Sequence, residues 1–174
     1  RVGDVLLVNS TATGPLVLDH LLPGRHLYRV ATGTGLAPCL SIIQDPELYE
    51  QVARVILTHG VRSLDELAYQ RQSSEELPRH EYLGELVHDK LLYYPTVTRE
   101  PYHNTGRLTA LLASGRLPED LGLPPIDPAT DRFMVCGSPA MLRDVCTLLD
   151  ERGFRESRHG EAAHYVIERA FVER

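Results

Sequence analysis

The fold of this 174-residue chain is decided by the segment Ala31–Pro38, which reads Ala-Thr-Gly-Thr-Gly-Leu-Ala-Pro. An apolar run, Leu27–Val30, precedes it and is typical of a buried strand, and Cys39–Ile43 follows it with the composition of a helix. A strand, a glycine turn and a helix in this order aim backbone N–H groups and a helix dipole at a phosphate. The segment therefore predicts a nucleotide-phosphate site. Because its spacing is only half of the dinucleotide fingerprint, a plain strand-to-helix turn is the alternative.

Short apolar strands and longer helical patterns alternate along the rest of the chain, which indicates an α/β fold with a parallel sheet and helices on both faces. A sharp break at Pro23-Gly24 predicts a domain boundary, with residues 1–24 on one side and 25–174 on the other. Strands are expected at Leu27–Ala31, Val52–Thr58, Leu91–Val97, Arg132–Cys136 and Tyr165–Val172. Helices are expected from Pro38, around Leu64–Ala68, and at Tyr82–Lys90, Arg107–Ala113 and Pro139–Arg152.

Composition excludes several classes of function. A net charge of −6 argues against broad binding to nucleic acid or to an anionic membrane. Three cysteines form no paired framework, which favours a reducing compartment and a cytoplasmic location. No Cys/His set has zinc spacing, so no metal is expected, and the nucleophile elbow of the α/β hydrolases is absent.

Several candidate binding residues follow predicted strands, whose carboxyl ends meet at one edge of a parallel sheet. The glycine turn supplies hydroxyl and amide donors for a pyrophosphate. Arg99 and Arg107 offer planar guanidinium forks that match phosphate oxygens, with solvated loop arginines as the alternative. Arg62 is a weaker candidate that could equally cap a helix or pair with a neighbouring carboxylate. The candidates from the turn are Thr32, Gly33, Thr34, Gly35 and Pro38.

Six motifs in a fixed order resemble the bacterial branch of the ferredoxin–NADP⁺ reductase family, and the resemblance covers essentially the whole chain. Besides the glycine turn, they are His59–Arg62, Tyr93–Glu100, Gly106-Arg107, Cys136–Pro139 and the closing Ala-Phe-Val-Glu-Arg of Ala170–Arg174. The resemblance implies a Rossmann-like NADP(H)-binding domain preceded by the remnant of an antiparallel, FAD-binding β-barrel. It also implies hydride transfer between NADP(H) and FAD, and exchange of single electrons with ferredoxin or flavodoxin by a monomeric enzyme.

The resemblance also assigns roles to residues. Arg99 and Arg107 would hold the adenosine 2′-phosphate, and Gly137 and Ser138 would lie beside the nicotinamide. Cys136 would help to orient that ring, a role that requires no thiolate; a small core residue is the alternative. The tail would cover one face of the flavin. It would place Phe171 and Glu173 at the catalytic centre and Ala170, Val172 and Arg174 against the cofactor.

The family's flavin-anchoring Arg-x-Tyr-Ser segment is not in this sequence. The chain is therefore expected to be a fragment that binds nucleotide but does not hold FAD by itself. Two other functions stay open. One is the NADH-dependent flavin reductase component of an oxygenase, against which the arginine pair and the tail argue. The other is a nucleotide-binding module without redox activity.

Overall fold

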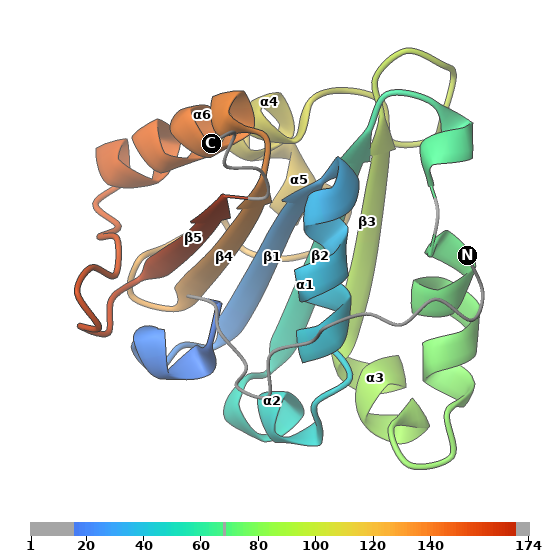
Figure 1. The fold of residues 1–174 in the computed structure, drawn as a ribbon, viewed down its shortest axis with the longest axis horizontal. Helices are drawn as coiled ribbons and strands as arrows, with labels where there is room; N and C mark the ends of the chain where they lie inside the picture. The colour runs from blue at the N-terminus through green and yellow to red at the C-terminus, as the bar shows by residue number, and fades with distance from the viewer. Residues whose placement is uncertain (1–15, 68, 170–174) are drawn as a thin grey trace, which may run out of the picture.

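Five parallel strands form one twisted sheet in the order β3-β2-β1-β4-β5 (Figure 1), in a computed structural model that describes residues 16–67 and 69–169. The strands are β1 (His26–Thr32), β2 (Arg54–Val61), β3 (Leu91–Val97), β4 (Asp131–Gly137) and β5 (Tyr165–Arg169). All seven residues of β4 are buried, as expected of a central strand with helices on both sides. The predicted α/β class with a parallel sheet is confirmed.

Helices cover both faces of the sheet, as the alternating pattern predicts (Figure 1). One layer holds α1 (Leu36–Ile42), α2 (Pro46–Gln51) and α3 (Gly84–Lys90). The other holds α4 (Leu108–Ala113), α5 (Arg116–Asp120) and α6 (Pro139–Glu151). Successive residues of β1 point into opposite layers, so Leu27 packs with the α1 layer and Tyr28 with the α6 layer. Two apolar cores result, one on each face.

Three helix predictions were wrong in detail. The helix expected around Leu64–Ala68 is a 3₁₀ turn that ends at Glu66, and none of the three residues Leu64–Glu66 is buried. The helix expected from Tyr82 begins at Gly84, since Tyr82 is 80% exposed. The helix expected from Pro38 begins two residues earlier, at the end of the glycine turn.

The short α-helices α2 and α5 were not predicted, and neither were the π-helix Gln72–Glu76 and the 3₁₀ helix Leu77–Arg79. A hydrogen bond from the Glu47 N–H to the Asp45 carboxylate caps α2, and Gly115 enters α5 with a φ of 77°. The strand expected over Val52–Thr58 runs instead from Arg54 to Val61, so its polar end reaches the carboxyl edge of the sheet. The last predicted strand can be followed only to Arg169, the last residue described.

The segment before β1 lies against the amino edge of the sheet. The Arg132 guanidinium donates to the carbonyl oxygens of Leu22, at 3.0 Å, and Pro128, at 2.8 Å. A side chain at Gly24 would collide with Arg132. Arg132 therefore fixes the entry of the chain into β1, and the domain boundary at Pro23-Gly24 remains a prediction.

Candidate nucleotide-binding site

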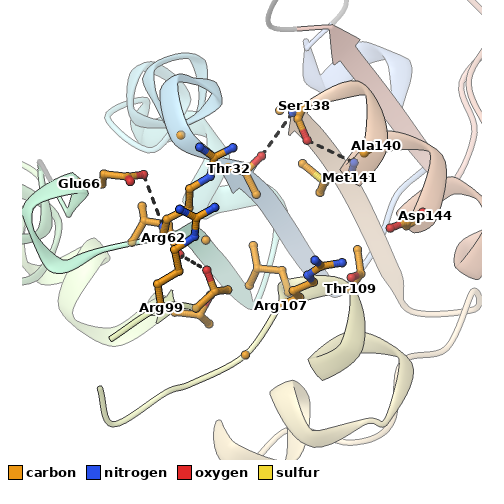
Figure 2. A pocket seen from close by; sticks show the side chains of 18 of the residues that line it. Thr32, Arg62, Glu66, Arg99, Arg107, Thr109, Ser138, Ala140, Met141 and Asp144 are labelled. Atoms are coloured by element: carbon orange, nitrogen blue, oxygen red, sulfur yellow. Dashed lines mark hydrogen bonds between the residues drawn. The ribbon is translucent and has the colours of Figure 1, made fainter. Parts of the chain in front are cut away.

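A cleft of about 730 Å³ opens at the carboxyl edge of the sheet, where parallel α/β sheets bind their ligands. The ends of β1, β2, β3 and β4 form its floor, and the first turns of α4 and α6 form its wall (Figure 2). The predicted convergence of strand ends is therefore present in the structure.

Threonine and glycine alternate across the floor of the cleft. The strand register sets Thr96 of β3 beside Gly60 of β2, and Gly60 beside Thr32 of β1. The same register continues to Gly137 of β4. A side chain at Gly137 would collide with the Thr32 hydroxyl and the end of Met141, so glycine lets these two side chains meet. The floor is thus narrow, polar and free of bulky side chains.

The glycine turn has two glycines with different tasks. Gly33 has a φ of +52°, a left-handed conformation that glycine adopts without strain, and a Cβ there would meet open space. Gly35 is buried, and a Cβ there would collide with the carbonyl of Cys136. Gly33 therefore shapes the rim of the cleft, whereas Gly35 permits α1 to approach β4 closely.

The amino end of α6 faces the same cleft. Ser138 caps this 13-residue helix, and its Oγ accepts a hydrogen bond of 3.3 Å from the Met141 N–H. The Ser138 N–H in turn donates to Thr32 Oγ1 at 3.3 Å, which ties the cap to the end of β1 (Figure 2). The positive end of the helix dipole thus lies beside the glycine turn, where it favours an anion.

Three arginines line the cleft from two loops: Arg62 follows β2, and Arg99 and Arg107 lie near the two ends of the loop between β3 and α4 (Figure 2). The Arg99 N–H donates to the Arg62 carbonyl at 2.8 Å, which holds the two loops together. The loop after β3 folds back on its strand through the Val97 N–H and the Asn104 carbonyl, at 3.1 Å, and so brings Arg107 to the cleft. In the part of the chain that is described, none of the three guanidinium groups has an ion-pair partner.

The carboxylates near these arginines accept hydrogen bonds from backbone N–H groups and from one hydroxyl, rather than from the arginine side chains. Glu66 accepts from the backbone N–H of Arg62 at 3.4 Å and from the Ser63 hydroxyl at 3.1 Å. Glu100 accepts from the Leu64 N–H at 2.7 Å. The carboxylates thus order the loop after β2, and the Arg62 guanidinium remains available to an anion.

Three predicted site residues, Gly35, Pro38 and Cys136, are absent from the lining of the cleft. Cys136 is 1% exposed and packs in the α1 layer with Cys39. Burial raises the pKa of its thiol to about 12, so Cys136 is neutral at pH 7. Its predicted role beside the nicotinamide remains a prediction. The remaining predicted residues, Ala170–Arg174, lie outside the described part of the chain.

The sequence did not reveal several residues of the lining. Thr96 lies in β3, Thr109 in α4 and Asp144 in α6. Whether such a residue lines the cleft depends on the face of its strand or helix that it occupies. That face is set by how the strands and helices pack, which the sequence alone does not give. The Thr96 hydroxyl is completely buried and has no hydrogen-bond partner within residues 16–67 and 69–169.

The donor set fits a phosphate-bearing nucleotide. It combines a capped helix terminus and a glycine turn with three guanidinium groups and a Thr96 hydroxyl that have no ion-pair or hydrogen-bond partner, respectively, among the described residues. Within residues 16–67 and 69–169, no group of three or more His, Cys, Asp or Glu side chains could hold a metal ion. Among the helices described, none has the length and apolar character needed to cross a membrane.

Fold and site together define a nucleotide-binding domain, and residues 30–147 match the model of the oxidoreductase NAD-binding domain family. The chain is 59% identical to the ferredoxin–NADP reductase of Azotobacter vinelandii and 57% identical to that of Pseudomonas aeruginosa, in each case over 100% of this chain and 68% of the relative. This chain belongs to the ferredoxin–NADP reductase family. It spans about two thirds of the length of these relatives.

A solved structure agrees with this membership. The ferredoxin NADP⁺ reductase from Neisseria gonorrhoeae, determined with bound FAD and NADP, matches with a TM-score of 0.79 and 28% identity. The match covers 92% of this chain and 62% of that protein. The predicted resemblance to the bacterial reductases is therefore confirmed.

Proposed function

We propose that this chain is the NADP(H)-binding part of a bacterial ferredoxin (or flavodoxin)–NADP⁺ reductase. One observation carries the proposal: three arginines, none of which forms an ion pair within the described part of the chain, line one cleft beside a glycine turn and a helix terminus. This arrangement suits a dinucleotide that bears a third phosphate, because each guanidinium can donate two parallel hydrogen bonds to phosphate oxygens.

The proposed orientation of the nucleotide follows from the distribution of charge. Arg62, Arg99 and Arg107 hold the 2′-phosphate and adenosine at the β2–β3 side of the cleft. The pyrophosphate crosses the rim formed by Gly33 and the amino end of α6. The nicotinamide then lies near the end of β4, beside Gly137 and Ser138.

The intact enzyme is an oxidoreductase in this proposal. When bound, the cofactors would supply hydride-transfer chemistry, with nicotinamide C4 of NADPH as the donor and N5 of FAD as the acceptor. The described residues bind and orient the nucleotide, and the buried thiol of Cys136 takes no part in proton transfer because it stays protonated. Ferredoxin or flavodoxin is the proposed electron carrier, since the relatives carry these names. A cytoplasmic location and a monomeric state complete the proposal.

Titration calorimetry with NADP⁺ and NAD⁺ tests the proposal. A charge-assisted phosphate contact contributes roughly 1.5–3 kcal/mol, so Arg99→Ala or Arg107→Ala should weaken NADP⁺ binding about ten- to a hundredfold. Neither change should affect the weaker binding of NAD⁺. Arg71→Ala is the matched control, because the Arg71 side chain is 79% exposed and lies outside the cleft.

Equal affinity of the unaltered chain for NADP⁺ and NAD⁺ would contradict the proposal. That result would favour the NADH-dependent reductase of an oxygenase. An equal loss in the control variant would show that the arginines act only through the overall charge of the chain.

A further inference from the structure

Glu100 is a carboxylate beside the phosphate-binding arginines to which the proposed function assigns no task. It follows Arg99 directly in the chain, is half-buried and does not line the cleft. A negative charge close to an anion site weakens the binding of the anion unless the side chain supports the site in another way. The hydrogen bonds of Glu100 therefore decide whether it opposes or supports the site.

The Glu100 side chain reaches across to the loop that carries Arg62. Its Oε2 accepts a hydrogen bond of 2.7 Å from the backbone N–H of Leu64, two residues after Arg62. Leu64 begins the 3₁₀ turn Leu64–Glu66, and the first N–H groups of a helical turn have no acceptor within it. Glu100 therefore caps this turn from the neighbouring loop.

Three further hydrogen bonds join the same two loops. The Val61 carbonyl accepts from the Thr98 N–H at 3.1 Å and from the Thr98 hydroxyl at 3.2 Å. The Arg62 carbonyl accepts from the Arg99 N–H at 2.8 Å. These bonds carry the pairing of β2 with β3 into the loops, and the contact of Glu100 closes the series beyond both arginines.

The backbone of Arg62 is consequently held at both of its polar groups. Its N–H donates to Glu66 at 3.4 Å, and its carbonyl accepts from Arg99. A loop that is ordered before the nucleotide arrives loses less conformational entropy on binding. Without Glu100, the turn Leu64–Glu66 loses its tie to the second loop, and the entropy cost of ordering Arg62 falls on the binding step.

We infer that Glu100 is a positioning residue whose carboxylate, bound to the Leu64 N–H, holds the loops of Arg62 and Arg99 in place for one phosphate group. The inference rests on the proposed function, since it assumes that these arginines bind the 2′-phosphate. Glu100 itself does not touch the nucleotide. Its benefit as a tie between the loops outweighs the repulsion between its charge and the phosphate.

The sign of one substitution separates the two effects of Glu100, because loss of a charge alone would tighten anion binding. Glu100→Ala should weaken the binding of NADP⁺ and of 2′-AMP by the same factor, about fivefold, and leave the weaker binding of NAD⁺ unchanged. Glu100→Gln keeps an acceptor oxygen without the charge, so it should bind NADP⁺ at least as tightly as the unaltered chain.

Asp65→Ala is the matched control for the loss of charge. Asp65 is an exposed carboxylate next to Leu64, and its side chain makes no hydrogen bond or ion pair within the described part of the chain. Asp65→Ala should leave NADP⁺ binding unchanged or make it slightly tighter. The same loss of one negative charge should therefore have opposite consequences at the two positions.

A second variant removes the other partner of the hydrogen bond. Leu64→Pro deletes the N–H and leaves the charge of Glu100 in place. Proline suits the first position of a helical turn, and the extended backbone of Ser63 suits the residue before a proline. Leu64→Pro should weaken NADP⁺ binding at least as much as Glu100→Ala. The double variant should bind NADP⁺ no more weakly than Leu64→Pro alone, because both changes break the same contact.

Unchanged or tighter NADP⁺ binding in Glu100→Ala, a loss that 2′-AMP does not share, or an equal loss of NAD⁺ would overturn the inference. Additive losses in the double variant would overturn it as well. If the unaltered chain binds NADP⁺ and NAD⁺ equally, the proposed function fails. Hydrogen exchange of the Leu64 amide still tests the tie in that case, because it should be faster in Glu100→Ala than in Asp65→Ala. Equal exchange rates would overturn the inference whatever the nucleotide affinities.

Discussion

Replacement of His59 by glutamine should change how the stability of the domain depends on pH. Burial lowers the pKa of His59 from 6.5 to about 4 in the folded chain, whereas the unfolded chain protonates near 6.5. Between these values, the unfolded state binds a proton that the folded state does not. The free energy of unfolding therefore falls as the pH drops from 6.5 toward 4.

The magnitude follows from the shift. One pKa unit corresponds to about 1.36 kcal/mol, so the full contribution is about 3 kcal/mol, of which about 2 kcal/mol is lost between pH 7 and 5. His59→Gln lacks this proton and should lose about 2 kcal/mol less than the unaltered chain over that interval. Other titrating groups, including His164, contribute equally to both proteins and cancel in the difference.

Urea unfolding at pH 7, 6 and 5 measures the effect. The unaltered chain and His88→Gln, which alters an exposed histidine, should give parallel curves of stability against pH. The curve of His59→Gln should be flatter. If all three curves run parallel, burial does not hold His59 neutral in the folded chain.

Two further substitutions test the packing around the site. Arg29→Met should raise the free energy of unfolding by about 1–3 kcal/mol. The reason is that Arg29 is completely buried, while among the described residues its Nε has no hydrogen-bond partner and its guanidinium has no ion pair. A lower melting temperature of the variant would contradict this reasoning. Ser138→Ala should destabilise the chain by about 1 kcal/mol in urea unfolding, because the hydroxyl that accepts from the Met141 N–H at the start of α6 is lost. A loss below about 0.3 kcal/mol would mean that water replaces this cap at no cost.

The sequence predicts the sheet well because parallel strands covered on both faces are almost continuously apolar. The glycine turn and Pro139 mark the two strand-to-helix transitions that border the cleft. The short helices α2 and α5 escape prediction because their stability comes from one cap and from burial of a few residues, not from a long periodic pattern. The 3₁₀ turn Leu64–Glu66 shows the converse, since helix-favouring residues without a buried face do not extend into a helix.

The residues of the candidate site likewise fall into two groups: those that the sequence predicts and those whose place depends on the packing of the strands. Thr32, Arg62, Arg99 and Ser138 could be predicted because strand ends meet at one edge whatever the strand order. Cys136 immediately precedes two lining residues, yet its side chain points into the α1 layer. Successive side chains of a strand point to opposite faces of the sheet, so a shift of one position along β4 decides which face a residue occupies. Whether Thr96 lies in the floor of the cleft depends on its neighbours in the sheet, which are far away in the sequence.

A ¹H–¹⁵N correlation spectrum recorded during titration with NADP⁺ tests the central claim most directly. The amides of Gly33, Arg62, Arg99 and Ser138 should shift, because they border the cleft at the carboxyl edge of the sheet. The amides of Gly84–Lys90, in α3, should stay in place and serve as the internal control. NAD⁺ at the same concentration should shift Arg62 and Arg99 far less. Shifts centred on α3, or equal shifts of the arginine amides with both nucleotides, would contradict an NADP(H) site in this cleft.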